Sequence, residues 1–506
     1  MDPSQIKRQG SIVLNDIVEY YSSLDDLPPG HSVKPGHLSP LVSHHVPEDP
    51  ESLETIRHDI KNTIIPGIVH WQSPNFYGWY PLSSSVPSIL ADMYMSMLNI
   101  APFSWLCSPT AAELEPIVMD AMGRLIGLDK RFLSNPGQNN KGSGGGAIQG
   151  GASESALVVM IAAREKAIAH QLSTIALNLG EEEKEDAADS IRIKLVAYCS
   201  DQTHSSIEKA AKIVGCKIYI VPTIDGDFSL TKKGLTQAVG KDIARGRIPF
   251  FVCATFGTTN TASIDDIPGI ADVCEQHRMW LHVDAAYAGA ALVCPEFRPL
   301  AAGIDRVDSF MFNPYKWMLT SVSCSCMWVA NSKDITSALS IHREYLPTAS
   351  SSSGEAVRDN HNWKLQLGQP FRALKLWMVL RMHGAAFIRQ HIRQKVELAQ
   401  WLASRLQEDR RFELVAPVVF GLVVFRIAPA AVLPASAAAG YSADDATTDL
   451  ATRIYKDGRV FLLPTRLYGR PAIRVAIGAT MCTQKHVAFL LSVIQQLTSE
   501  IITQEE

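Results

Sequence analysis

The 506-residue sequence lacks several features that mark common classes of protein. It has no stretch near the ~18 uninterrupted apolar residues that a membrane-spanning helix needs. Its first residues, MDPSQIKRQGSIVLND, lack the apolar centre of a secretory signal. The nine cysteines are scattered without a CxxC pair, and such a set indicates reduced thiols in an intracellular protein. We therefore expect a cytoplasmic protein with no membrane partner.

An excess of either charge is also missing. The chain has 47 lysines and arginines against 51 aspartates and glutamates, for a net charge of −4. Neither a nucleic acid nor an acidic membrane surface would find a basic patch to bind. Hydrophobic residues make up 46% of the chain, which is typical of a globular protein whose core is large enough for a cofactor site.

Three parts of the chain differ in pattern. Residues 1–85 begin with a helical pattern and continue into a passage rich in proline, glycine and histidine, which suits a segment that wraps over another surface. Residues 86–373 alternate helical patterns with short apolar runs. Residues 374–506 begin with a long helical stretch and lead into strands and a last helix, as in a small α+β domain.

The middle part predicts an α/β fold. Its apolar runs IKLVAYCS, KIYIVPT, PFFVCATFG and WLHVDAAYAG are nearly continuous, as buried parallel strands are. Their alternation with helices favours a mostly parallel central sheet with right-handed crossovers. The acidic run GEEEKEDAAD, residues 180–189, is interpreted as a solvated loop.

Small residues precede a helical pattern at Gly150, Gly151, Ala152 and Ser153. Unobstructed backbone N–H groups at a helix start suit a phosphate, although a flexible turn explains the glycines equally well. The letters GSGGGA, residues 142–147, match G-x-G-x-x-A, but NPGQNNK before them is no strand, so we reject a dinucleotide fingerprint. The Gly-Lys-Ser/Thr ending of a nucleotide P-loop is missing as well.

Polar residues end several of the predicted strands. Asp284 closes one apolar run, at the end of a parallel strand where ligands bind. His204 lies at a helix start after another run, where a partly exposed histidine needs no function, and Thr259 follows a third. His282 and Asp284 could form a metal pair, but no further ligands accompany them, so we predict no metal site.

One lysine interrupts the apolar run MFNPYKWMLT. Lys316 either directs its ammonium group outward from a core strand or serves as a catalytic amine of low pKa or a Schiff base. Together, the phosphate-type turn, His204, Thr259, Asp284 and Lys316 match one cofactor, pyridoxal 5′-phosphate (PLP). It needs an anion cradle, a ring-stacking group, a carboxylate for its pyridine nitrogen and a lysine amine.

The sequence resembles the group II PLP-dependent decarboxylases of fold type I, most closely the aromatic-L-amino-acid decarboxylases. The likeness runs over nearly the whole chain and includes PNFYGWYP, IQGGASESAL, YCSDQTHSSIEKAA, ATFGTTN, WLHVDAAYAG and DSFMFNPYKWMLT. The resemblance implies that Lys316 binds the cofactor aldehyde, Asp284 pairs with the pyridinium and His204 stacks on the ring. The other implied cofactor-binding residues are Ala152, Ser153, Thr259, Ala286, Asn313 and Gly368.

The resemblance also implies an activity and an assembly. Members form homodimers in which the N-terminal segment clasps the partner. A tyrosine on a loop protonates the substrate, and Tyr345 holds the matching position; the implied catalytic residues are Lys316, His204, Tyr345 and Asp284. Some relatives in which phenylalanine replaces the tyrosine or asparagine replaces the histidine are aldehyde synthases, so retention of His204 and Tyr345 favours decarboxylation. A catalytically inactive, partner-binding paralogue is a further alternative, against which the full set argues.

The implied substrate pocket is aromatic and apolar, and its residues are Trp71, Tyr80, Pro81, Leu82 and Phe103. Such walls suit a planar side chain. Leu82 stands where a threonine is common in relatives that handle catechols, and Tyr315 stands where histidine or serine is usual. The missing hydroxyl at Leu82 favours tryptophan and phenylalanine over dihydroxyphenylalanine, with tryptophan first.

Overall fold

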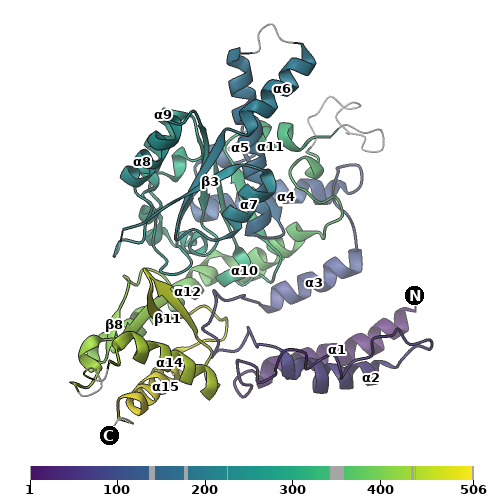
Figure 1. Cartoon of the computed structure of the whole chain (residues 1–506). Helices are drawn as coiled ribbons and strands as arrows, with labels where there is room; N and C mark the ends of the chain where they lie inside the picture. The colour runs from purple at the N-terminus through teal and green to yellow at the C-terminus, as the bar shows by residue number, and fades with distance from the viewer. Residues whose placement is uncertain are drawn as a thin grey trace. The chain divides into compact units, whose positions relative to one another are not determined.

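The computed structural model describes residues 2–135, 143–175, 180–224, 226–341, 358–434, 438 and 440–503. Their contacts divide the chain into two compact units (Figure 1). One unit contains Met1–Pro81, Leu398–Ala416 and Gly421–Glu506, and the other contains Leu82–Glu397 and Pro417–Phe420. This partition does not test the three-part division at residues 85 and 373, which stays a prediction.

The unit of Leu82–Glu397 is built on a seven-stranded sheet with the order β1-β7-β6-β5-β4-β2-β3. Neighbours among β2 to β6 run parallel, and β7 is antiparallel to both β1 and β6. The predicted α/β fold with a mostly parallel sheet is therefore confirmed. The strands are β1 (Gly145–Gln149), β2 (Leu195–Ser200), β3 (Lys217–Val221), β4 (Ile248–Thr255), β5 (Trp280–Asp284), β6 (Ser309–Phe312) and β7 (Ser325–Val329).

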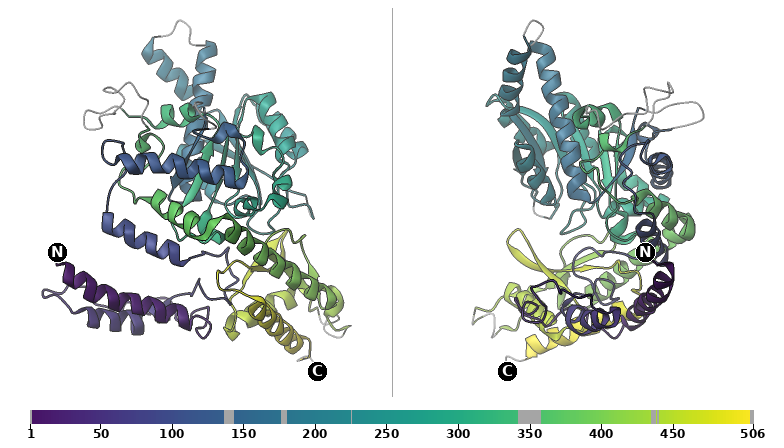
Figure 2. Two further views of the ribbon diagram at one scale, coloured as in Figure 1. Left: turned by 180° about the vertical axis from the view of Figure 1, so that it is seen from behind. Right: turned by 90° about the vertical axis from the view of Figure 1, so that its right-hand side faces the viewer.

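Helices cover both faces of this sheet (Figure 2). Ala197 and Cys199 of β2 belong to the core beneath α5 (Ala152–Ile175) and α7 (Ser206–Val214). Tyr198, between them in the chain, points to the other face, where its hydroxyl donates to Asp242 of α8 at 3.1 Å. Burial on both faces explains why these strands are apolar without alternation. The helices of the second face include α8 (Lys232–Ile243) and α9 (Ile267–His277).

The acidic run interpreted as a loop is instead helical, so that interpretation was wrong. It forms α6 (Glu181–Arg192), with three glutamates in the first turn and Lys184 paired with Glu181 at 2.7 Å. Glutamate, lysine and alanine favour helices, and acidic groups at a helix N-terminus are stabilised by the helix dipole. Other helices of this unit are α3 (Val86–Leu98), α4 (Pro109–Ile126), α10 (Pro314–Trp317) and α11 (Ser332–Leu339).

The predicted long helical stretch is α12 (Arg372–Glu408), interrupted at Gly384, whose φ of 71° is not helical. The unit that holds the end of α12 has a four-stranded antiparallel sheet with the order β10-β11-β9-β8. This agrees with the predicted α+β character of the C-terminal part. Its elements are β8 (Phe412–Leu414), β9 (Leu422–Ile427), α14 (Ala443–Asp457), β10 (Leu463–Leu467), β11 (Arg470–Ala476) and α15 (Gln484–Thr503).

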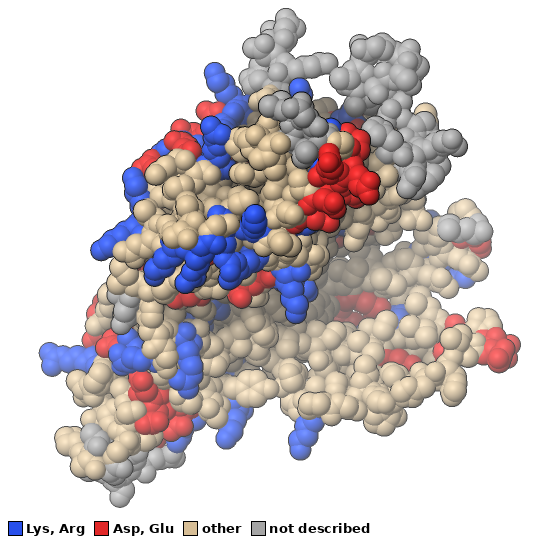
Figure 3. All heavy atoms as spheres, turned by 45° about the horizontal axis from the view of Figure 1, so that its top comes forward, with Lys and Arg blue, Asp and Glu red and all other residues tan. Residues whose placement is uncertain are grey.

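The N-terminal residues form α1 (Pro3–Ser23) and α2 (Leu53–Asp59), which are joined by an ion pair between Asp16 and Arg57 at 2.6 Å. Both helices are fully described, and neither contains a buried residue. On the face shown in Figure 3, acidic and basic side chains form small separate groups. Within the described ranges, no helix combines the length and the apolar character needed to cross a bilayer.

Candidate active site

Several of the predicted cofactor residues follow strands at one edge of the seven-stranded sheet. β1 is antiparallel to β7 and β7 is antiparallel to β6, so β1 runs in the same direction as the parallel strands. Asp284, at the end of β5, pairs in register with Thr255 of β4 and Met311 of β6. The segments that follow β1, β2, β4, β5 and β6 therefore start at the same edge, where parallel sheets bind ligands.

Lys316 lies in α10, directly after β6, and is not on a strand. The lysine is half-buried, and its backbone N–H donates to the carbonyl of Asn313 at 3.1 Å. The N–H of Ser83 donates to the carbonyls of Tyr315 at 2.8 Å and Lys316 at 3.1 Å. The next residue, Trp317, is buried and donates from its indole to the carbonyl of Tyr287 at 2.6 Å. These contacts fix the backbone that carries the lysine.

Asp284 is a buried carboxylate with 5% of its surface exposed. Its Oδ1 accepts the N–H of Ala286 at 2.9 Å. His282 lies two residues earlier on the same face of β5, and its Nδ1 is 2.8 Å from the hydroxyl of Ser309. Burial lowers the pKa of His282 to about 4, so this imidazole is neutral near pH 7 beside Asp284. Among the described residues, no group of three or more His, Cys, Asp or Glu residues could hold a metal.

Replacing His282 by leucine should weaken the pH dependence of stability between about pH 6.5 and pH 4. The unfolded chain takes up a proton on this histidine near the ordinary pKa of 6.5, whereas the folded chain does so only near 4. The unfolded state therefore binds more protons in this window, and stability falls as the pH falls, by about 3 kcal/mol over the whole window. Denaturant titrations at about pH 7.5, 6 and 5 measure this slope; equal slopes in variant and wild type would contradict the assignment.

The turn at which the sequence predicts an anion cradle lies between β1 and the start of α5. The N–H of Gly150 donates to Oε2 of Glu154 at 2.6 Å. An added Cβ at Gly151 would lie 3.7 Å from the hydroxyl of Tyr315, and the backbone of Ala152 is a hydrogen-bond partner of the same hydroxyl. Burial raises the pKa of Tyr315 to about 12, so the phenol is protonated near neutral pH.

Asn313 supplies a second feature of a ligand site. It follows β6, is 1% exposed, and its Oδ1 is a buried acceptor without a hydrogen-bond partner among the described residues. A buried polar atom without a partner is costly unless something else satisfies it. The backbone N–H groups of the α5 turn, the amine of Lys316 and the carboxylate of Asp284 together fit PLP, which carries a phosphate, an aldehyde and a basic ring nitrogen.

The remaining predicted cofactor residues are half-buried or exposed. His204 follows β2 and is exposed, and its Nδ1 accepts the N–H of Ser206 at 3.2 Å. Thr259 and Ala286 are half-buried after β4 and β5, and Ser153 is exposed in the first turn of α5. Gly368 is also exposed, and an added Cβ there would meet nothing within 4 Å. Tyr345 lies outside the described residues. The roles of all these residues stay predictions.

The predicted substrate residues fall into both units. In one unit, Trp71 stacks on Trp79 with ring centroids 5.2 Å apart, and the guanidinium of Arg474 lies 5.3 Å from the ring centroid of Tyr80. Pro81 belongs to the same unit, whereas Leu82 and Phe103 belong to the other. The pocket as a whole therefore stays a prediction.

Sequence reasoning missed two residues that lie in the site and left the side chain of a third unplaced. Glu154 binds the Gly150 amide, and its position in the first turn of a helix after a glycine turn was a usable signal. Ser309 is 2.8 Å from His282 and accepts the indole N–H of Trp280 at 2.7 Å; no local signal marks it. Tyr315 was noted as a departure from the family pattern, without a position for its hydroxyl.

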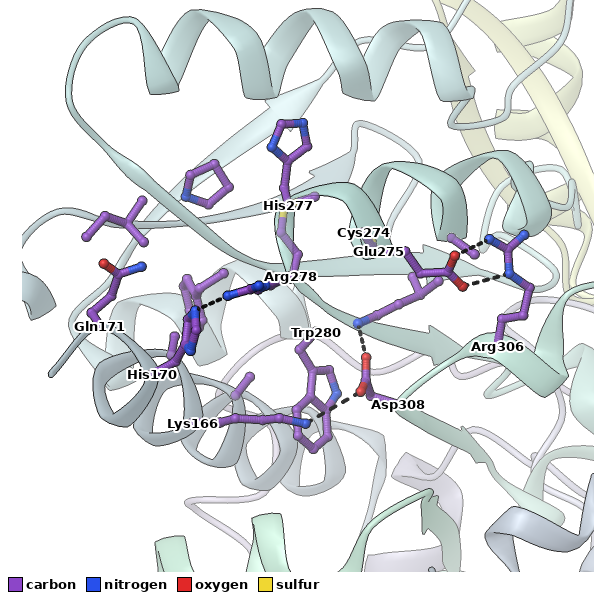
Figure 4. Close-up of a pocket in the computed structure, with 18 of the residues that line it drawn as sticks. Lys166, His170, Gln171, Cys274, Glu275, His277, Arg278, Trp280, Arg306 and Asp308 are labelled. Atoms are coloured by element: carbon purple, nitrogen blue, oxygen red, sulfur yellow. Dashed lines mark hydrogen bonds and ion pairs between the residues drawn. The ribbon is translucent and has the colours of Figure 1, made fainter. Parts of the chain in front are cut away.

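A separate cavity of about 610 Å³ lies in the same unit (Figure 4). Its lining includes the starts of β4 and β5, so it lies at the edge of the sheet opposite to Asp284. Its cations already have partners, because Lys166 is 2.8 Å from Asp334, Arg306 is 2.8 Å from Glu275, and Arg278 donates to His170 at 2.8 Å. None of the predicted site residues lines it.

Comparisons with known proteins agree with the geometry. The family model described as the pyridoxal-dependent decarboxylase conserved domain matches residues 35–428. The aromatic-L-amino-acid decarboxylase of Mus musculus is 39% identical over 506 residues, covering all of both chains. The phenylacetaldehyde synthase of Arabidopsis thaliana is 37% identical, covering 99% of this chain and 97% of its own.

A solved structure is similar over the whole fold. The crystal structure of Oryza sativa TDC with PLP and tryptamine has a TM-score of 0.92 and 34% identity, and the match covers 99% of each chain. The family model and the full-length likeness both identify the same family. The chain therefore belongs to the aromatic amino acid branch of the pyridoxal-dependent decarboxylase family and is a PLP-dependent carboxy-lyase.

Proposed function

We propose that the protein decarboxylates aromatic L-amino acids to arylalkylamines and carbon dioxide, with tryptophan favoured over phenylalanine, tyrosine and dihydroxyphenylalanine. The observation that carries the proposal is the arrangement of Lys316 and Asp284. The buried carboxylate ends β5, and the half-buried lysine follows the neighbouring strand β6. An amine and a carboxylate at the same sheet edge, beside an anion cradle, are the groups that PLP chemistry requires.

When bound, PLP supplies an electron sink for the electron pair that stays on Cα as carbon dioxide leaves. Lys316 would hold the cofactor through its Nζ amine. Asp284 would hold the proton on the ring nitrogen of the cofactor, because burial reduces the screening of the carboxylate charge. His282 is neutral, so it forms no ion pair with the Asp284 carboxylate that would weaken this interaction.

Asn313 and the amides at the start of α5 would hold the phosphate, and His204 would cover one face of the ring. For the last step, Tyr345 is proposed to deliver the proton to Cα of the substrate. Retention of His204 and Tyr345 supports the amine as product. The full set, including Lys316 and Asp284, argues against an inactive paralogue.

A second candidate function is that of an aldehyde synthase. The 37% identity to the phenylacetaldehyde synthase of Arabidopsis thaliana favours it. In this reaction the amino acid, oxygen and water give the aldehyde, carbon dioxide, ammonia and hydrogen peroxide. The two candidates differ in whether a proton or oxygen reaches Cα first, and therefore in their products.

The preference for tryptophan rests on the predicted pocket. Trp71 is stacked on Trp79, and Tyr80 is 7% exposed, so the aromatic residues of this segment are packed in place. Leu82 offers an apolar contact and no hydroxyl for a catechol. The Oryza sativa structure that this chain resembles holds tryptamine, which supports an indole substrate.

We also propose a homodimer. Helix α1 has no buried residue and exposes Ile6, Val13, Leu14 and Val18, the first and last of these by 58% and 59%. An amphipathic helix with an exposed apolar stripe gains stability when a second surface covers it. A second copy of the chain is the proposed partner.

Purified protein supplied with tryptophan should release tryptamine and carbon dioxide in equal amounts. Tyrosine, phenylalanine and dihydroxyphenylalanine should be converted with lower kcat/KM, and glutamate should be left unchanged, because no basic side chain is found among the predicted pocket residues. Product identification by mass spectrometry, beside oxygen uptake, measures this. Indole acetaldehyde with stoichiometric hydrogen peroxide would establish the second candidate, and no product from any aromatic amino acid would refute both.

A further inference from the structure

We propose that Glu115, Lys364 and Arg358 are positioning residues for the cofactor phosphate, because they hold the outer edge of β1, the strand that leads into the turn at Gly150. This inference rests on the cofactor site of the proposed function and deepens it. The three residues come from α4 and from the segment that precedes α12, and they meet only in the folded chain.

Strand β1 needs such support because it is an edge strand. It stands first in the sheet order, and β7 is its neighbour among the described strands. The backbone groups of alternate residues therefore point away from β7, where no further strand of the described sheet meets them. Two side chains take the place of that strand. Arg358 donates from Nη2 to the carbonyl of Gly146 at 2.7 Å. Glu115 accepts the N–H of Ile148 with Oε1 at 3.0 Å.

A buried ion pair joins these side chains. Oε2 of Glu115 lies 2.7 Å from Nζ of Lys364, and the two side chains are 3% and 2% exposed. Nη2 of Arg358 lies 3.9 Å from Oε1 of Glu115. Burial alone would raise the pKa of Glu115, but the neighbouring ammonium and guanidinium groups outweigh this effect and lower it. The carboxylate therefore stays charged, and it accepts the N–H of Ile148 more strongly than a neutral carboxyl group would.

Residues 358–364 are tied to β1 at a further point. Gln149, the last residue of the strand, donates from Nε2 to the carbonyl of Trp363 at 2.8 Å. The guanidinium of Arg358 lies 4.0 Å from the ring centroid of Trp363, a cation–π contact that holds both side chains in place. Hydrogen bonds at Gly146, Ile148 and Gln149 thus fix the position of the strand along its outer edge.

The position of β1 matters to the phosphate because the turn follows at once. The strand ends at Gln149, and α5 begins at Ala152. Backbone N–H groups at the start of a helix suit a phosphate, and a hydrogen bond weakens steeply when its donor moves or tilts. A shift of Ile148 reaches these N–H groups over a few residues of chain. The ion pair therefore acts on the phosphate through β1, without touching it.

A double-mutant cycle on the full-length chain, after the cofactor is removed, tests the role of the charges. Lys364→Met and Glu115→Gln each leave one buried charge without its partner, so β1 should shift and the Kd for PLP should rise about tenfold. The Lys364→Met/Glu115→Gln variant lacks both charges and keeps an amide oxygen that can accept the N–H of Ile148. Its Kd for PLP should return to within about threefold of the wild type, because residues in contact are not additive.

A second uncharged variant isolates the hydrogen bond to β1. Lys364→Met/Glu115→Leu has neither the charges nor an acceptor, and it should bind PLP as weakly as the single variants, because the N–H of Ile148 is left without a partner. The two uncharged variants differ only in the acceptor. Their comparison therefore decides even where a single variant fails to fold.

Pyridoxal separates positioning of the phosphate site from a general loss of structure. It has a hydroxymethyl group in place of the phosphate ester of PLP, so its Kd should stay within about twofold in every variant. Lys166→Met is the matched control. It removes a lysine that is 2.8 Å from Asp334 and lines the cavity at the opposite edge of the sheet, and it should change neither Kd.

Three results would overturn the assignment. The first is wild-type PLP affinity in both single variants. The second is an equal loss of PLP and pyridoxal binding, which would mean that the ion pair only supports the fold. The third is equal PLP affinity in the two uncharged variants. Failure of the proposed function gives a different pattern, because the wild-type chain would then fail to decarboxylate aromatic amino acids while its PLP affinity still depended on Glu115 and Lys364.

Discussion

Replacing Lys316 by alanine is expected to lower the decarboxylation rate by on the order of 10³-fold or more, equal to about 4 kcal/mol of barrier. The side chain sits on a backbone fixed by Ser83 and by the buried Trp317, so its removal deletes an amine without unfolding α10. Alanine is also a good helix former. The function expected to be lost is the attachment of the cofactor.

Borohydride reduction gives a readout that does not depend on turnover. In the wild type it should fix the cofactor to the peptide that contains Lys316, and in Lys316→Ala that peptide should carry no label. Lys194→Ala is the matched control, because Lys194 is exposed just before β2, and it should keep both the label and the rate. Label on another lysine of the wild type, with normal turnover by Lys316→Ala, would mean that the lysine of this apolar run has no chemical role.

The parts of the site that could be predicted from the sequence are those with a local signal. Asp284 and Thr259 were placed correctly at the sheet edge because each follows an apolar run that has the pattern of a buried strand. The start of a helix after Gly150 and Gly151 was also predicted, because small residues before a helical pattern are a local feature. The cofactor prediction followed from the order of these signals along the chain.

Other features depend on contacts between distant residues and leave no local signal. Strand β1 was overlooked because its glycines resemble a turn; an added Cβ on Gly146 would lie 2.7 Å from Trp328, and one on Gly145 would lie 2.8 Å from Trp363. The two positions need glycine because the tryptophans pack closely against the strand, and the glycines do not indicate a loop. The position of the Tyr315 hydroxyl beside Ala152 likewise depends on two segments that are far apart in the sequence.

Asp284→Ala is expected to lower kcat by about three orders of magnitude, because each ~1.4 kcal/mol of lost stabilisation at Cα is tenfold in rate. The carboxylate is 5% exposed and accepts the N–H of Ala286. Asp284→Asn keeps this acceptor and the shape of the side chain but removes the charge. If the charge is what matters, both variants should be slow; if the hydrogen bond to Ala286 is what matters, the asparagine variant should be near the wild type.

A cofactor analogue provides the decisive comparison for Asp284. Methylation of the ring nitrogen of PLP gives it a fixed positive charge, so this analogue no longer needs a carboxylate to hold a proton there. It should restore part of the rate of Asp284→Ala and give the wild type no advantage.

Asp265→Asn is the matched control, since Asp265 is also buried at 2% exposure but accepts the backbone N–H groups of Leu230 and Thr255 at 2.6 and 2.7 Å. That variant should lose stability and keep its kcat per folded molecule, whereas near-normal turnover by Asp284→Ala would rule out the electron-sink role of the carboxylate.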